Sequence, residues 1–96
     1  MYKKLNPILH SQLRLAVISL LMNVKDADFT YIKEKTGATS GNLSVQIEKL
    51  SEANYISVNK FFKGKKPKTV CKITKNGIAA FEEYVNNLKN YLGISE

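Results

Sequence analysis

Apolar residues recur at helical spacing over much of the chain, and the clearest stretch is 40–52. Leu43, Ile47 and Leu50 are four and three residues apart, so they lie on one side of a helix. The other side carries small, amide and charged residues. This pattern predicts a helix with one side toward the core, followed by Asn54, a residue that tolerates a left-handed stop.

A second helix is predicted over 11–23, and it is apolar on two sides. Ser11 is its expected N-cap, because a serine hydroxyl accepts a hydrogen bond from an unpaired helix N–H. The wider apolar face consists of Leu13, Ala16, Val17, Leu20, Leu21 and Val24, and the second of Leu15, Ile18 and Met22. Since each face must be covered, one is expected to meet the chain's own core and the other the C-terminal helix or a second subunit.

The C-terminal helix is predicted over 75–92, after the capping residue Thr74. Its apolar residues are three or four apart, as in a heptad seam: Ile78, Phe81, Val85, Leu88 and Leu92, widened by Tyr84 and Tyr91. Such a seam packs within one chain or joins two copies. Together with the first helix it favours a symmetric dimer, the commonest oligomer. The predicted dimer residues are Leu15, Ile18, Met22, Phe81, Tyr84, Val85, Leu88, Tyr91 and Leu92.

A short helix is predicted over 31–36, capped by Thr30 and ended by Gly37. Phe29, just before it, is expected to make a short strand contact. The short helix, a turn of about three residues and the helix over 40–52 match the helix-turn-helix pattern.

Polar and apolar residues alternate after the third helix, which predicts strands over 55–62 and 69–74. The connecting turn, 63–68, is rich in lysine, and Pro67 is expected in the loop because it cannot donate to a sheet ladder. The expected fold class is mainly α (α+β): one domain over 1–96, a winged helix-turn-helix with a two- or three-stranded β-wing and a C-terminal dimerisation helix.

Charge is concentrated in one part of the chain. Fifteen basic residues stand against eight acidic ones, a net charge of +7, and 60–68 holds five lysines and no acid. A basic segment of this density indicates a polyanionic partner, either nucleic acid or an acidic membrane surface.

The rest of the composition argues against secreted, membrane-spanning, metal-binding and enzymatic proteins. A single cysteine, Cys71, excludes an intrachain disulfide and indicates a reducing compartment; it is expected to be a small buried hydrophobe, not a redox sensor. No secretion signal or membrane span is found, so a cytoplasmic, nucleoid-associated protein without a membrane partner is expected. His10 has no second ligand at metal-binding spacing, and no catalytic set is present. Neither a metal or other cofactor nor an enzymatic activity is expected.

The candidate contact residues lie on the third helix and the wing. On the helix they are Ser40, Asn42, Ser44, Val45, Gln46 and Lys49. Amides pair bidentately with adenine and a valine packs on a thymine methyl group, whereas the alternative is a solvated helix face. On the wing they are Lys60, Lys63, Lys65, Lys66 and Lys68, suited to phosphate. Arg14, Tyr31 and Lys33 are weaker candidates for phosphate contacts.

Several segments in order resemble the winged-helix transcriptional regulators of the MarR and ArsR type, especially small single-domain members. They are N-P-x-x-H-S-x-x-R at 6–14, G-N-L-S…K-L-x-x-A-N-Y-I at 41–56, K-P-K-T at 66–69 and T-x-x-G at 74–77. The likeness covers about 5–92. It implies sequence-specific binding of double-stranded DNA as a homodimer on a pseudo-palindrome, with recognition helices in successive major grooves.

Two positions depart from the family pattern: Asn54 replaces a glycine, and Cys71 replaces an aromatic residue in the return strand. The sequence indicates no effector ligand. Two other functions remain open at this stage, a winged-helix adaptor that docks an acidic partner protein and a protein that coats DNA without sequence preference.

Overall fold

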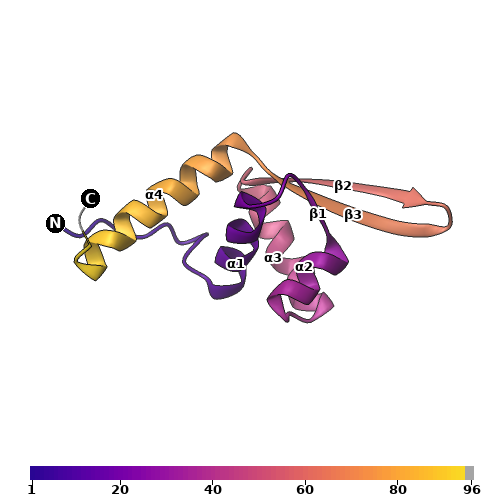
Figure 1. Ribbon diagram of the computed structural model, residues 1–96, viewed down its shortest axis with the longest axis horizontal. Coiled ribbons are helices and arrows are strands. Elements are labelled where there is room, and N and C mark those ends of the chain that lie inside the picture. The colour runs from indigo at the N-terminus through magenta and orange to yellow at the C-terminus, as the bar shows by residue number, and fades with distance from the viewer. Residues whose placement is uncertain (95–96) are drawn as a thin grey trace.

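The computed structural model describes residues 1–94 and contains four helices and a three-stranded antiparallel sheet (Figure 1). In chain order the elements are α1 (Gln12–Met22), β1 (Ala27–Asp28), α2 (Phe29–Thr36), α3 (Ser40–Glu52), β2 (Ile56–Lys63), β3 (Lys66–Ile73) and α4 (Lys75–Leu92). This is the winged helix-turn-helix fold that the sequence predicts, and the sheet has three strands because β1 joins the hairpin.

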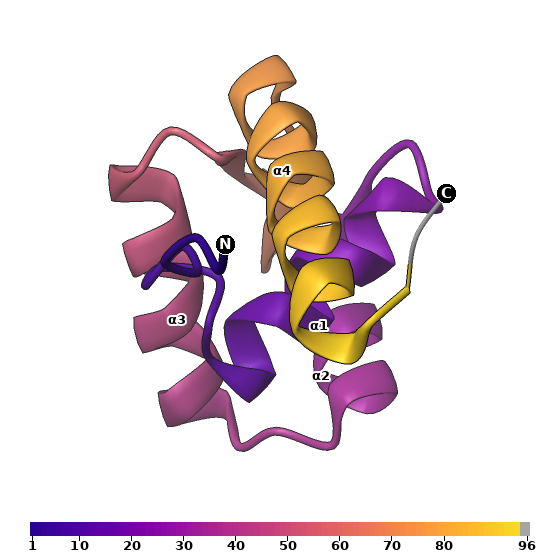
Figure 2. The same cartoon turned by 90° about the vertical axis from the view of Figure 1, so that its left-hand side faces the viewer.

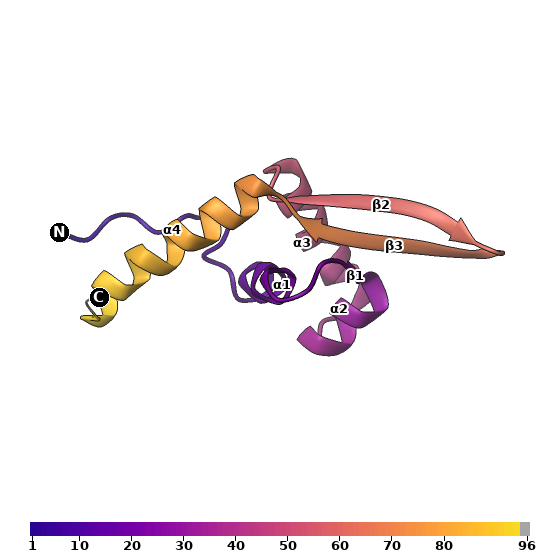
Figure 3. The same cartoon turned by 45° about the horizontal axis from the view of Figure 1, so that its top comes forward.

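The molecule is elongated, with extents of 53 × 25 × 21 Å. Helices α1, α2 and α3 form the middle, the β2–β3 hairpin projects from one end, and α4 extends from the other beside the N-terminal segment (Figures 1 and 3). The radius of gyration is 14.4 Å, against about 13 Å for a compact domain of this length. Both ends therefore reach beyond the central helices.

The core lies among the three central helices and the base of the sheet. Viewed along the long axis, α3 lies on one side of this bundle and α2 on the other (Figure 2). The predicted inner residues of α3, Leu43, Ile47 and Leu50, are all buried. They pack in one cluster with Leu9, Val17, Ile18, Leu21, Ala27, Ile32, Ile56, Cys71 and Tyr84.

The wing differs from its predicted form in length. The strands pair from Ile56–Ile73 out to Lys63–Lys66, so only Gly64 and Lys65 form the turn. Gly64 has a φ of 66°, at the first central position, where a type II′ hairpin turn needs a glycine. The predicted turn over 63–68 was wrong because cross-strand pairing continues through residues that resemble a loop in composition.

Pro67 accordingly lies in β3, opposite Phe62, and not in the loop. The closing pair of a two-residue hairpin exchanges hydrogen bonds, so the next pair along does not. The backbone nitrogen of Pro67, which carries no hydrogen, therefore faces the outer edge of β3. Strand β1 covers that edge only at Val70 and Cys71, so no ladder hydrogen bond is lost at Pro67.

Helix α2 begins two residues earlier than predicted, and its cap is Asp28 instead of Thr30. The Asp28 carboxylate accepts a hydrogen bond from the Tyr31 N–H at 2.8 Å. The short strand contact comes from Ala27–Asp28 and not from Phe29. An aspartate competes well with threonine at this position because its charge also complements the helix dipole.

The other helix ends are close to those predicted. Ser11 precedes α1, but its side chain makes no capping hydrogen bond, so this part of the prediction was wrong. Thr74 caps α4 as predicted, Thr39 caps α3, and Asn54 adopts the left-handed conformation with a φ of 62°. No helix within residues 1–94 is long and apolar enough to cross a membrane.

Candidate nucleic-acid interface

The outward side of α3 carries the residues that the sequence selects for base contacts. Ser40, Asn42, Ser44, Val45 and Lys49 are exposed, while Gln46 is half-buried. Val45 has 48% of its surface exposed, although it is apolar. Asn42, Val45 and Lys49 point away from the buried stripe of α3, whereas Ser40 and Gln46 border it. The core therefore holds the helix while its other side remains open for contact.

Gln46 is half-buried because Arg14 of α1 reaches it. The Arg14 side chain donates from Nε to the Ile8 carbonyl at 2.6 Å and from Nη1 to Gln46 Oε1 at 2.5 Å. Gln46 Nε2 in turn donates to Asn42 Oδ1 at 2.9 Å. Arg14, predicted as a phosphate contact, thus binds the predicted base-contact residue Gln46 directly, and Gln46 in turn binds Asn42. The Arg14–Gln46 bond spans 32 residues and no local pattern indicates it.

The wing lysines divide between two faces of the hairpin. Because side chains alternate along a strand, the cross-strand pair Lys63–Lys66 shares one face with Lys68, while Lys60 lies on the other and Lys65 in the turn. Lys72, also exposed, belongs to the first face and was not among the predicted contacts. The alternation that predicted β3 was the signal that could have found it.

This lysine face consists of Lys63, Lys66, Lys68 and Lys72. Like charges directly opposite each other destabilise a hairpin, and Lys63 and Lys66 are direct partners. A bound polyanion relieves that repulsion, so the arrangement favours a phosphate backbone as partner.

Exposed aromatic side chains stand among these lysines near the wing tip. Phe61, 42% exposed, lies on the lysine face, and Phe62, 74% exposed, lies on the opposite face with Pro67. The tip therefore offers apolar as well as basic surface.

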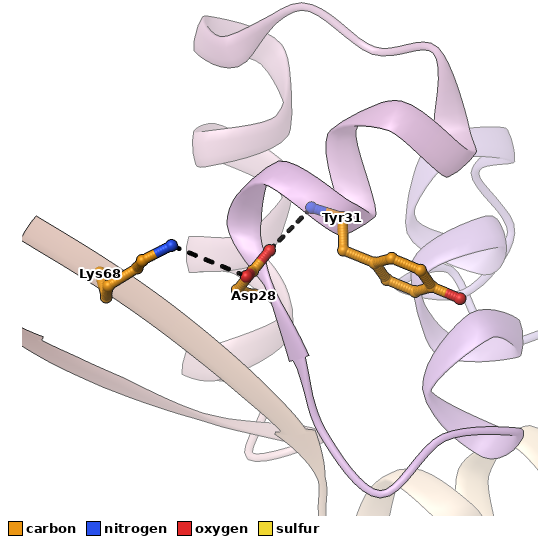
Figure 4. Close-up of polar contacts among 3 residues, drawn as sticks. All are labelled: Asp28, Tyr31 and Lys68. Atoms are coloured by element: carbon orange, nitrogen blue, oxygen red, sulfur yellow. Dashed lines mark hydrogen bonds and ion pairs between the residues drawn. The ribbon is translucent and has the colours of Figure 1, made fainter. Parts of the chain in front are cut away.

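Lys68 lies at the base of the wing and is partly engaged within the chain. Its Nζ lies 4.0 Å from Asp28 Oδ2, while Asp28 Oδ1 caps α2 and the Tyr31 ring points away from the wing (Figure 4). Both partners are more than a third exposed, so this ion pair contributes well under about 1 kcal/mol. It nevertheless links β3 to the first turn of α2.

A groove separates α3 from the wing, and its charge is not basic. Glu48 and Glu52 from α3 line it with Lys60 from β2, together with Phe29, Ser44, Ile47, Ser51, Val58 and Thr69. Two carboxylates against one ammonium leave the groove slightly negative, which is unfavourable for a phosphate. Phosphate contacts are thus better served by the lysine face than by Lys60.

The two weaker candidates on α2 are exposed. Tyr31 and Lys33 lie on its surface, and the Lys35 ammonium stands 5.6 Å from the centre of the Tyr31 ring. This cation–π contact holds a positive charge near Tyr31.

Comparison with known proteins identifies the family to which this chain belongs. A family model described as a winged helix DNA-binding domain matches residues 13–92. The chain belongs to this family. The family and the fold are those of DNA-binding transcriptional regulators and not of enzymes.

Individual relatives are consistent with this assignment. The winged-helix chain is 35% identical over 78 residues to the uncharacterized protein MJ0432 of Methanocaldococcus jannaschii, covering 81% of this chain and 85% of that protein. The structure of a transcriptional regulator homologue from Pyrococcus horikoshii OT3 matches with a TM-score of 0.82 and 27% identity, over 90% of this chain and 85% of that one. PadR from Bacillus subtilis, solved in complex with operator DNA, shares the fold at 17% identity, with a TM-score of 0.69 over 78% of this chain and 47% of that one.

The structure places the predicted dimer residues of this winged-helix chain in two groups. Ile18 is fully buried and Tyr84 is 4% exposed, so both belong to the chain's own core. The Tyr84 hydroxyl lies 3.0 Å from His10 Nδ1, and the Tyr91 hydroxyl donates to the Lys3 carbonyl at 2.7 Å. The other seven are at least partly exposed: Leu15, Met22, Phe81, Val85, Leu88, Tyr91 and Leu92.

Cys71 is fully buried in the winged-helix core. Burial in apolar surroundings raises the pKa of its thiol to about 11, so the reactive thiolate is scarce near neutral pH. Within residues 1–94 no cluster of His, Cys, Asp or Glu is arranged to hold a metal ion.

Proposed function

We propose that two copies of this chain bind one double-stranded DNA site with sequence preference and thereby regulate transcription. In each copy α3 enters the major groove, and the lysine face of the wing contacts the backbone or the adjacent minor groove. One observation carries the proposal: an exposed helix side with amides and an apolar valine stands beside a hairpin whose lysines repel each other.

The two elements suit two separate tasks. Amide and apolar side chains distinguish base edges, whereas lysines on a hairpin contact phosphates without distinguishing sequence. PadR of Bacillus subtilis, which shares this fold, has been solved with operator DNA. That precedent supports DNA as the partner here.

A dimer is favoured by the surface that α4 leaves open. Its 18 residues span about 27 Å, and the helix extends beyond the central bundle (Figure 3). Phe81 and Val85 line a groove with Met22 of α1, and Leu92 is 63% exposed. A second copy that covers this strip would bury apolar surface and place two α3 helices on one duplex.

The proposal is tested by selecting bound duplexes from a random pool with the full chain, followed by a salt series on the selected site. We expect a palindromic site with half-sites about one helical turn apart. Contact with six to ten phosphates would reduce affinity about a thousandfold or more between 50 and 200 mM salt.

Other outcomes of the same experiment would contradict the proposal. Equal affinity for selected and random duplexes would indicate a protein that coats DNA. Absence of duplex binding at low salt would leave an adaptor for an acidic partner protein as the better interpretation of the lysine face.

A further inference from the structure

The side chain of Arg14 is held in place by the chain's N-terminal segment. Its Nε donates to the Ile8 carbonyl at 2.6 Å, and Nη2 lies 3.5 Å from the Pro7 carbonyl. Arg14 is also only partly exposed. These contacts hold the guanidinium in a fixed position next to α3.

A guanidinium has donors and no acceptor. The atom of Gln46 that faces Arg14 Nη1 must therefore be the amide oxygen, and the amide nitrogen must lie on the other side. That nitrogen points to Asn42, whose facing atom must for the same reason be its oxygen, at 2.9 Å. One arginine thus determines the orientation of both amides.

This orientation leaves an unusual set of groups for a partner. Asn42 is exposed, and its oxygen is turned along the helix toward Gln46, so its NH₂ group is the part directed away from the network. Within residues 1–94 that NH₂ group makes no hydrogen bond, and Gln46 retains one further N–H. The pair presents N–H donors, and each of its amide oxygens already accepts one hydrogen bond within the chain.

We propose that Arg14 is a positioning residue that makes the Asn42–Gln46 pair select guanine over adenine. This inference rests on the proposed function and specifies its base preference. Guanine presents two acceptors in the major groove, N7 and O6, whereas adenine presents an acceptor and a donor. A freely rotating amide satisfies adenine with one N–H and its oxygen. In the pair held by Arg14, each oxygen already accepts a hydrogen bond from a neighbouring side chain, so the free groups are N–H donors.

The variants that test this inference are Arg14→Met and Arg14→Lys. Methionine retains length but donates nothing, so both amides are free to rotate. Lysine also only donates, so it can hold the Gln46 oxygen and keep the orientation. Lys25→Met, at an exposed position just after the same helix, is the control for an added methionine.

The first measurement uses the free proteins and needs no DNA. In nitrogen–proton correlation spectra we expect the side-chain NH₂ signals of Gln46 and Asn42 to lie away from random-coil values in the wild type. They should move toward those values in Arg14→Met but not in Lys25→Met. Unchanged signals in Arg14→Met would overturn the inference whether or not the chain binds DNA.

The second measurement compares selected sites. We expect the wild type and Arg14→Lys to prefer guanine at one position of each half-site, by about tenfold over adenine. Replacement of that guanine by 7-deazaguanine, which lacks N7, should remove most of the preference. Arg14→Met should accept both purines while its melting temperature shows that it remains folded.

Two results would overturn the base preference and leave the proposed function intact: selection of adenine by the wild type, or an unchanged preference in folded Arg14→Met. Absence of duplex binding by the wild type would overturn both. A mere packing role for Arg14 would lower stability without changing the preferred base.

Discussion

A single glycine, Gly77, allows the start of α4 to lie close to the backbone at Tyr55. A Cβ atom built at Gly77 would lie 2.1 Å from the Tyr55 carbonyl oxygen and 2.8 Å from Ile73 Cγ1. The same carbonyl accepts a hydrogen bond from the Thr74 N–H at 3.0 Å. Gly77 therefore allows the first turn of α4 to pack directly on the backbone that follows α3.

Gly77→Ala is expected to destabilise the fold by about 2 kcal/mol or more, because backbone must move to admit the methyl group. Helix propensity alone predicts the opposite, a gain of up to about 1 kcal/mol. Gly41→Ala is the control, since a Cβ there meets nothing within 4 Å. Urea unfolding measures both variants, and a Gly77→Ala protein as stable as the wild type would show that the close approach is absent.

At the scale of elements, the wing combines a well-predicted strand pattern with a poorly predicted turn. Alternation placed β2 and β3 correctly in outline. The extra pairs at the tip are Phe61–Lys68, Phe62–Pro67 and Lys63–Lys66, and they involve a proline and three lysines, residues that local preferences assign to loops. Pairing between strands overcame those preferences, and it also brought Lys63, Lys66, Lys68 and Lys72 onto one face.

Lys66→Gln is expected to weaken binding to every duplex similarly and to reduce the slope of log affinity against log salt by about one. Fold stability should stay the same or rise slightly, because the repulsion from Lys63 is removed. Lys4→Gln is the control, since Lys4 is exposed in the N-terminal segment, at the end away from the wing (Figure 1). Equal salt slopes for the two variants would exclude a phosphate contact at Lys66.

At the scale of the whole molecule, the elongated shape leaves two projecting ends and one half-buried apolar strip. Of the two alternatives for the second face of the first helix, coverage within the chain accounts for part of it, because Ile18 is fully buried in the chain's own core. Met22 remains partly exposed beside Phe81 and Val85 of α4. This smaller surface is the part of the predicted dimer contact that stays open.

Val85→Glu is expected to shift the chain toward monomer, because it replaces an apolar contact beside Met22 and Phe81 with a second carboxylate next to Glu82. Affinity for a full palindrome should fall at least tenfold, while affinity for a half-site stays the same. Asn90→Glu, at an exposed position of the same helix, is the matched control. Sedimentation measures the mass, and a wild type that is monomeric at all concentrations would contradict the dimer.

The sequence by itself determined the order of the elements, most helix ends and the inward residues of α3, because helical and strand periodicity are properties of neighbouring positions. Only the tertiary structure decided which polar groups meet. Arg14 and Gln46 are 32 positions apart, and the lysine face depends on a register that extends through Pro67. These contacts arise from the packing of whole elements against one another, so no window of the sequence contains them.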